Sequence, residues 1–168
     1  MAAKKRTILD DLASRLPHGA PCFISDDHAM YDLVSVLRAC DALASSRYHA
    51  IVTSMPGLVP SLGITMDERI RNLLSERGHT DLLFQVEQPD LADALTVGLN
   101  RLWSERERVS HEIARHVPVQ LRRMGEMGLA FADEVTRIYP DVVPRAVSRS
   151  WEHYLPSLSP ALRKLCAA

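Results

Sequence analysis

Two pairs of polar residues follow short apolar runs, and their types could bind and protonate an anion. Arg47 and His49 follow one run, and Asp67 and Arg69 follow the next. Arginine can hold a carboxylate or phosphate with two parallel hydrogen bonds, and histidine can act as an acid or base near neutral pH. An apolar run that leads into a polar turn is typical of a strand preceding a helix, and open α/β sheets bind ligands at such strand ends.

The hydrophobic pattern around these residues predicts strands that alternate with helices. Compact apolar runs predict strands, and apolar residues spaced three and four apart predict helices. This alternation indicates βαβ units and a parallel sheet. Within it, Thr65 is the predicted N-cap of a helix that Gly78 ends, and Glu68 completes a capping box. The strands are expected at 22–25, 42–45, 58–64 and 82–86, and the helices at 7–15, 30–40, 50–55 and 65–77.

From Pro89 onward the pattern changes to long helical stretches. Pro118 should break or kink the first, and Tyr139-Pro140 should end the second. His111 and His116 lie there among arginines and are expected to face solvent. We therefore divide the chain into an N-terminal helix and connection (1–20), a Rossmann-like domain (21–140) and a C-terminal tail without assigned structure (141–168).

The two polar motifs resemble those of the polysaccharide pyruvyl transferase family. Ser46-Arg47-Tyr48-His49-Ala50 is similar to that family's Arg-Leu-His-Ala motif. Gly63-Ile64-Thr65-Met66-Asp67-Glu68-Arg69 is similar to its Gly-Ile-Ser-Tyr-Asp-Pro-Lys stretch, with Met66 and Glu68 in place of the aromatic residue and the proline. The resemblance covers roughly residues 21–134 and only the C-terminal half of such a protein.

The resemblance implies a fold, an activity and roles for the four polar residues. Family members have two Rossmann-like halves facing each other, as in GT-B glycosyltransferases. They transfer the enolpyruvyl group of phosphoenolpyruvate to a sugar hydroxyl as a ketal, in cell-surface or exopolysaccharide biosynthesis. His49 would be the catalytic acid or a phosphate partner, and Arg47, Asp67 and Arg69 would bind substrate.

A chain that resembles only the C-terminal half of such an enzyme would depend on a partner for activity. The expected ligands are phosphoenolpyruvate and a sugar or polysaccharide-precursor acceptor. Activity would need a separate N-terminal half or a homo-oligomer that rebuilds the cleft.

Other interpretations of these residues stay open. The chain could be half of a GT-B-like glycosyltransferase or sugar epimerase, or a non-catalytic binding or dimerisation module. Arg47 and His49 could be a surface pair, Asp67 a first-turn acid that complements the helix dipole, and Arg69 a solvated side chain.

Length and composition exclude several classes of protein. The 168 residues suit one domain, and 46% hydrophobic with 24% charged residues is typical of a globular chain. A net charge of -1 gives no electrostatic case for binding nucleic acid. The sequence has no apolar run long enough to span a bilayer and no signal peptide, so we expect a cytoplasmic location. Three unevenly spaced cysteines suggest neither disulfides nor zinc, and the lack of a glycine-rich phosphate loop argues against a nucleotide cofactor. Asp26, Asp27 and His28 are adjacent and cannot easily converge on one ion, so we expect no metal.

Overall fold

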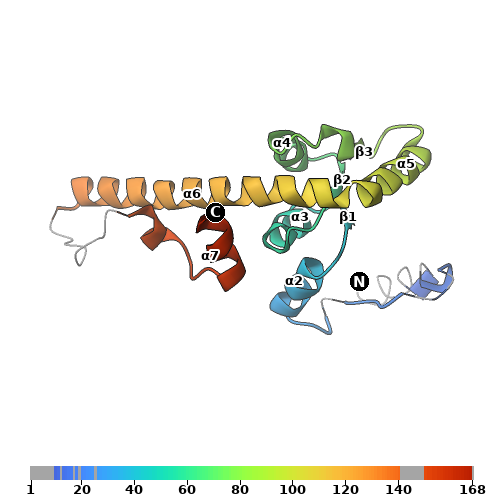
Figure 1. Ribbon diagram of the computed structural model, residues 1–168, viewed down its shortest axis with the longest axis horizontal. Coiled ribbons are helices and arrows are strands. Elements are labelled where there is room, and N and C mark those ends of the chain that lie inside the picture. Colours follow the sequence, from blue (N-terminus) through green and yellow to red (C-terminus); the bar gives the residue numbers. More distant parts are fainter. Residues whose placement is uncertain are drawn as a thin grey trace.

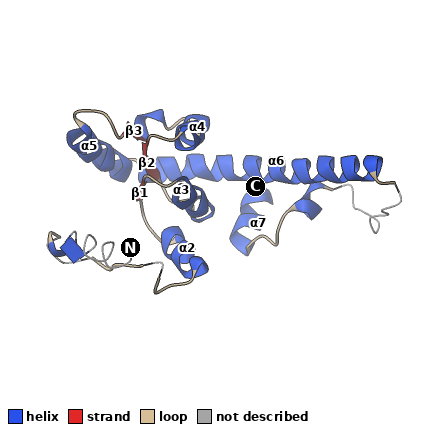
Figure 2. Cartoon of the chain, turned by 180° about the vertical axis from the view of Figure 1, so that it is seen from behind, coloured by secondary structure: helices blue, strands red, loops and turns tan. Residues whose placement is uncertain are grey.

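The computed structural model describes residues 10–11, 13–16, 18, 20–24, 26–140 and 150–167. They form a mixed α/β fold in which a small parallel sheet is flanked by helices, and one long helix extends well beyond the sheet (Figures 1 and 2). The elements are α2 (Met30–Arg38), β1 (Leu43–Ser45), α3 (Tyr48–Ser54), η1 (Met55–Gly57), β2 (Ser61–Thr65), α4 (Glu68–Glu76), η2 (Thr80–Leu82), β3 (Leu83–Gln85), α5 (Leu91–Ser104), α6 (Arg106–Ile138), η3 (Trp151–Tyr154) and α7 (Pro160–Ala167).

The three strands are parallel and lie in the order β1-β2-β3. Leu43 is paired with Ser61, and Gly63 is paired with Leu83, so β2 is the central strand. Helices α3 and α4 connect consecutive strands, as a parallel sheet requires. The alternation predicted from residue 30 to residue 86 is therefore confirmed.

Alternating residues of β2 face two different layers of helices. Leu62 belongs to the core formed with α5 and α6. Gly63 faces the opposite layer, where Ile51 of α3 packs with Ile70 and Leu74 of α4. A Cβ atom at position 63 would lie 2.6 Å from Cγ2 of Ile70, so the absence of a side chain allows α4 to approach the sheet closely.

The strand predicted at 22–25 is wrong for the residues that the structure describes there. Cys22 to Ile24 form no strand, and Ser25 lies outside the described residues. Phe23 is 47% exposed, with its ring centroid 5.6 Å from that of His28. A short apolar run forms a strand only where a neighbouring strand supplies hydrogen bonds, and this segment precedes α2 away from the sheet.

The N-terminal helix predicted at 7–15 lies partly outside the described residues. Positions 7–9 and 12 cannot be assigned, whereas residues 10, 11, 13 and 14 are helical.

Helix α6 runs without interruption through Pro118, so the predicted break is wrong. The helical stretch is instead interrupted at Glu105, between α5 and α6. Proline removes one backbone hydrogen bond, but Ile113 and Val117 are buried in the core just before it and hold the helix in place. The predicted end before Tyr139-Pro140 is confirmed.

The C-terminal region packs back on the second half of α6. Gly125 and Gly128 of α6 lie against Trp151 and Tyr154 of η3, where added Cβ atoms would come within 2.6 Å of those residues. Residues 141–149 and 168 lie outside the described residues. Within the described parts of the chain, no helix has both the length and the apolar composition needed to cross a bilayer.

Candidate functional site

The two polar motifs lie at the same edge of the sheet. Ser45 at the end of β1 is paired with Gly63 near the end of β2, and both strands point in the same direction. The segments that follow them, 45–49 and 65–69, therefore leave the sheet side by side. We call these two segments the carboxyl edge.

The first segment turns tightly and leaves two polar side chains exposed. Oγ of Ser45 accepts a hydrogen bond from the backbone N–H of Arg47 (3.0 Å), and Arg47 is the N-cap residue of α3. The side chains of Arg47 and His49 are exposed. Among the described residues, no carboxylate pairs with the Arg47 guanidinium, which is therefore available to an external anion.

The second segment repeats this turn with a threonine. Oγ1 of Thr65 accepts a hydrogen bond from the backbone N–H of Asp67 (2.5 Å), and the Asp67 carboxylate accepts one from the N–H of Arg69 (2.8 Å). Asp67 is thus the N-cap of α4, and the predicted capping box starting at Thr65 is wrong. Thr65 is still part of β2, and the chain needs the next residues to turn before the helix can begin.

Arg69 is held in place on both sides. Its Nη2 lies 2.5 Å from Oδ2 of Asp67, and its guanidinium carbon lies 5.5 Å from the centre of the Tyr48 ring. Hydrogen bonds from Arg69 lower the pKa of the Asp67 carboxyl below its usual value. The Tyr48–Arg69 contact joins the two motifs directly, and Tyr48 is a site residue that the sequence analysis did not single out.

A groove of about 490 Å³ extends from this contact to α6. Tyr48 and Arg69 line one end, and Val117, Leu121 and Met124 line the other. Its lining is mainly apolar, with polar side chains including Asn72, Glu76 and Gln120.

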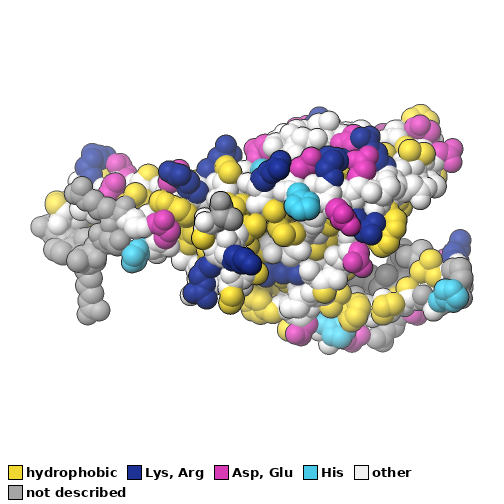
Figure 3. All heavy atoms as spheres, viewed as in Figure 1, with side chains coloured by type: hydrophobic (Ala, Val, Ile, Leu, Met, Phe, Trp, Pro, Cys, Tyr) yellow, Lys and Arg dark blue, Asp and Glu magenta, His cyan; other side chains and the backbone are white. Residues whose placement is uncertain are grey.

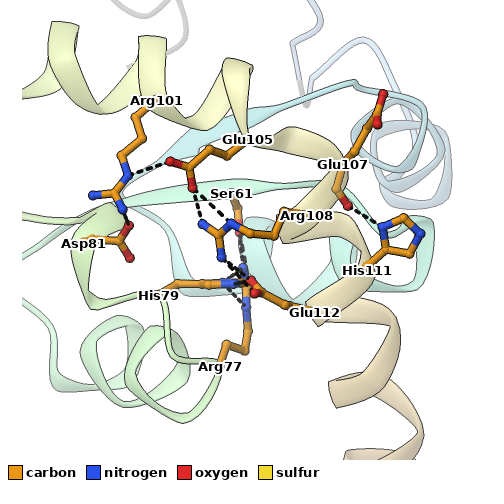
Figure 4. Close-up of polar contacts among 10 residues, drawn as sticks. All are labelled: Ser61, Arg77, His79, Asp81, Arg101, Glu105, Glu107, Arg108, His111 and Glu112. Carbon is orange, nitrogen blue, oxygen red and sulfur yellow. Dashed lines mark hydrogen bonds and ion pairs between the residues drawn. The ribbon is translucent and has the colours of Figure 1, made fainter.

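A buried polar network lies at the opposite ends of the strands (Figure 4). Arg77 lies directly after α4. Its Nη1 donates a hydrogen bond to Oγ of Ser61 (3.2 Å), and its Nε donates one to Nδ1 of His79 (3.2 Å). Nε2 of His79 lies 2.7 Å from Oε2 of Glu112, which also accepts from Arg108 (2.8 Å). Because Nδ1 faces the arginine donors, the proton of neutral His79 resides on Nε2 and is donated to Glu112.

Burial determines the charge state of this network. His79 is 1% exposed, and burial lowers its pKa below the usual value despite the opposing hydrogen bond to Glu112. Burial also lowers the pKa of Arg77, to about 10, so Arg77 stays charged at neutral pH. The network connects α4, β2 and α6, and it lies away from the carboxyl edge.

No periodic pattern predicted this network, because neither Arg77 nor His79 lies in a regular apolar pattern. Of the two histidines expected to face solvent, His111 is exposed, as predicted. His116 is not. Its Nε2 is buried, with no hydrogen-bond partner among the described residues, and burial lowers its pKa.

No protein-family model matches the chain, and no match was found among curated proteins or among solved structures.

Proposed function

We propose that this chain is the donor-binding half of a polysaccharide pyruvyl transferase-like enzyme with a GT-B-like arrangement. It would take part in transfer of the enolpyruvyl group of phosphoenolpyruvate to a sugar as a ketal. One observation supports this most strongly. The two segments that resemble the family's motifs, 46–50 and 63–69, are neighbours at one sheet edge, and Arg69 contacts Tyr48.

The anionic groups of phosphoenolpyruvate suit the exposed cationic side chain at the carboxyl edge. Phosphoenolpyruvate carries a carboxylate and a phosphate on a small rigid frame, and Arg47 offers a guanidinium that no described carboxylate occupies. Its planar set of donors suits either group. In this proposal Arg47 contacts the donor directly.

His49 is the second residue of α3, two positions after the N-cap residue Arg47, and its side chain is exposed at the same edge. Ketal formation adds a proton to the methylene carbon, forms carbon–oxygen bonds to two sugar hydroxyls and breaks the carbon–oxygen bond to phosphate. The two hydroxyls lose one proton each, which balances the proton added to the methylene carbon and one that leaves with the phosphate. His49 either protonates the methylene carbon or holds the departing phosphate. A phosphate close by would favour its charged form.

Asp67 and Arg69 have supporting roles in this proposal. The Asp67 carboxylate already accepts bonds from the start of α4 and from the Arg69 side chain, so it acts as a positioning residue. Arg69 keeps a positive charge beside Tyr48, close to the segment that carries Arg47 and His49.

In this proposal Arg47 and His49 are exposed because this chain supplies only one wall of the site. A second wall has to exclude water and bind the acceptor sugar. We assign it to an N-terminal Rossmann-like half or to a second protein surface of that kind.

Calorimetric titration with phosphoenolpyruvate tests the proposal. Arg47→Ala should weaken binding by about 1.5 to 3 kcal/mol, the usual range for a hydrogen bond to a charged group. Arg115→Ala is the matched control, because Arg115 is an exposed arginine of α6 away from the carboxyl edge, and it should bind as the unmodified chain does.

Two further titrations separate the alternatives. His49→Ala should leave the affinity nearly unchanged if His49 transfers a proton, and weaken it if His49 holds the phosphate. A nucleotide sugar that binds while phosphoenolpyruvate does not would contradict the proposal and favour a glycosyltransferase half. Binding of neither would favour a non-catalytic module.

A further inference from the structure

One side of α6 faces the end of α4 with polar residues that are spaced four apart and therefore lie on one face of the helix. Polar residues also end α4 and form the turn after it. Positive and negative side chains are mixed on the surface where α4, α5 and the start of α6 meet (Figure 3). The polar seam is the set of residues at which the two helices face each other, Glu112, His116 and Gln120 of α6 and Glu76, Arg77 and His79 at the end of α4.

Hydrogen bonds join the two sides at both ends of the polar seam. Nε2 of His79 lies 2.7 Å from Oε2 of Glu112, and Nε2 of Gln120 lies 3.4 Å from Oε2 of Glu76. Between these two contacts along α6 lies His116, whose Nε2 is buried without a hydrogen-bond partner among the described residues. The polar seam therefore contains two imidazoles that the carboxyl edge does not use.

The hydrogen bonds of His79 fit only the neutral ring. Arg77 faces Nδ1 of this ring with two nitrogen atoms, Nε at 3.2 Å and Nη2 at 3.0 Å (Figure 4). A guanidinium has donors and no acceptor, so Nδ1 has to accept. A proton on Nδ1 would place donor against donor and one positive charge against another. Either Arg77 or the ring would then have to move.

Burial is the main reason why His79 resists protonation, and it lowers the pKa of this ring below its usual value. The positive charge of Arg77 acts in the same direction. Glu112 and Asp81 favour the charged ring. The Glu112 carboxylate is shared, however, because Nη1 of Arg108 lies 2.8 Å from both of its oxygens.

His116 is subject to the same effects. Burial lowers its pKa, and the charge of Arg77 lowers it further. Glu76 opposes this shift, whereas Arg123 and His79 add to it. Protonation of both imidazoles would therefore gather positive charge around Arg77, which is itself only 7% exposed.

We propose that the polar seam is an acid-sensitive switch, which holds the end of α4 against α6 at neutral pH and releases it when His79 and His116 take up protons. The release is confined to the end of α4, because both helices are anchored elsewhere. Leu74 of α4 packs in the layer that faces α3, and Ile113 of α6 packs in the core on the other side of the sheet.

The switch also borders the groove beside α3 and α4. Glu76 and Gln120 line this groove from α4 and α6, so their separation would widen it at that end. The inference concerns the polar seam alone and does not depend on the proposed function.

Hydrogen exchange followed by NMR tests the switch in the full chain. The amides of Arg77, Gly78 and His79 report on it, because each donates to a carbonyl of α4. After correction for intrinsic exchange rates, their protection should fall by about threefold to a hundredfold between about pH 7 and about pH 5.5. Each histidine contributes up to about tenfold at one pH unit below its ordinary pKa. Unchanged protection would overturn the proposal.

Low concentrations of urea distinguish local release from unfolding of the whole chain. At about pH 5.5, exchange at residues 77–79 should not depend on urea, because local release exposes little surface, whereas amides of β2 should exchange faster as urea is added. The same urea dependence at residues 77–79 and in β2 would overturn the proposal.

A neutral variant separates the charge of His79 from its shape. In His79→Gln, the side-chain oxygen can accept from Arg77 and the side-chain nitrogen can donate to Glu112. This variant should keep the protection at about pH 7 and lose part of the pH response, and adding His116→Gln should remove the rest. A full pH response in the double variant would overturn the proposal.

Ring nitrogen signals test the switch without any substitution. At about pH 7, NMR should show His79 neutral, with its proton on Nε2. A charged His79, or a neutral ring with its proton on Nδ1, would overturn the proposal.

Discussion

Arg47 and Arg69 are the same type of residue at the same sheet edge, but their surroundings differ. The Arg69 guanidinium is engaged by Asp67 and lies over the Tyr48 ring. The Arg47 guanidinium has no carboxylate partner among the described residues. The resemblance implied substrate binding for both, and in the proposed site Arg47 is the arginine that meets the incoming anion.

The buried histidine gives the first prediction, which concerns pH. The pKa of His79 in the folded chain lies below the ordinary value of 6.5, so the unfolded chain takes up a proton more readily. The contribution of neutral His79 to the free energy of unfolding is therefore fully present above about pH 6.5. It decreases as the pH falls from there towards the lowered pKa of the folded chain. Urea unfolding at a series of pH values should show this decrease in the free energy of unfolding.

A pair of histidine variants identifies the residue responsible. His79→Gln should reduce the pH dependence between about pH 7 and pH 5, although His116, whose pKa is also lowered, retains a part of it. His116→Gln is the second variant, and it should remove the remaining part. An identical pH dependence in the His79 variant would contradict the assignment.

At the scale of the elements, the sequence was most informative where a pattern repeats or a turn residue stands alone. Apolar runs located β1, β2 and β3, and Gly78, with a φ of 74°, ends the region of α4 as predicted. The cap of α4 was misplaced because Thr65 and Asp67 both have capping side chains, and only the end of β2 decides between them. Local patterns show that an element exists, whereas neighbouring elements determine where it starts.

The close approach of α4 to β2 gives the second prediction. Gly63→Ala would place its Cβ 2.6 Å from Cγ2 of Ile70 and 2.8 Å from Cδ1 of Leu74, so these two side chains or α4 itself have to shift. We expect a loss of about 1 to 3 kcal/mol in the free energy of unfolding, the usual cost of overpacking. Ser75→Ala on the exposed side of α4 should change it by less than about 0.5 kcal/mol. An equally small effect at position 63 would show that α4 lies further from the sheet.

The unbroken α6 gives the third prediction. Pro118 lacks the N–H that would continue the hydrogen bonds of the helix, and proline in a helix interior costs about 3 kcal/mol relative to alanine. Pro118→Ala should therefore raise the free energy of unfolding, by about 1 to 3 kcal/mol when loss of the ring's packing is allowed for. Thermal unfolding measures this change, and a lower melting temperature would mean that the proline ring contributes more through packing than it costs.

At the scale of the whole molecule, the sequence predicted a parallel α/β domain followed by long helices, and the structure agrees. It did not predict the network of Ser61, Arg77, His79 and Glu112, because these residues come from separate elements and meet only in the folded chain. It also placed a strand at 22–25, where no neighbouring strand is present. Long-range pairing and burial of single polar residues leave little trace in a local pattern.

The central claim is that the two motifs form one donor site, and an NMR titration of the ¹⁵N-labelled chain with phosphoenolpyruvate tests it most directly. Amide signals of segments 45–49 and 65–69 should shift together with one saturation curve, and Arg47→Ala should abolish the shifts while Arg115→Ala preserves them. No shift up to about 10 mM, or shifts confined to other parts of the chain, would contradict the claim.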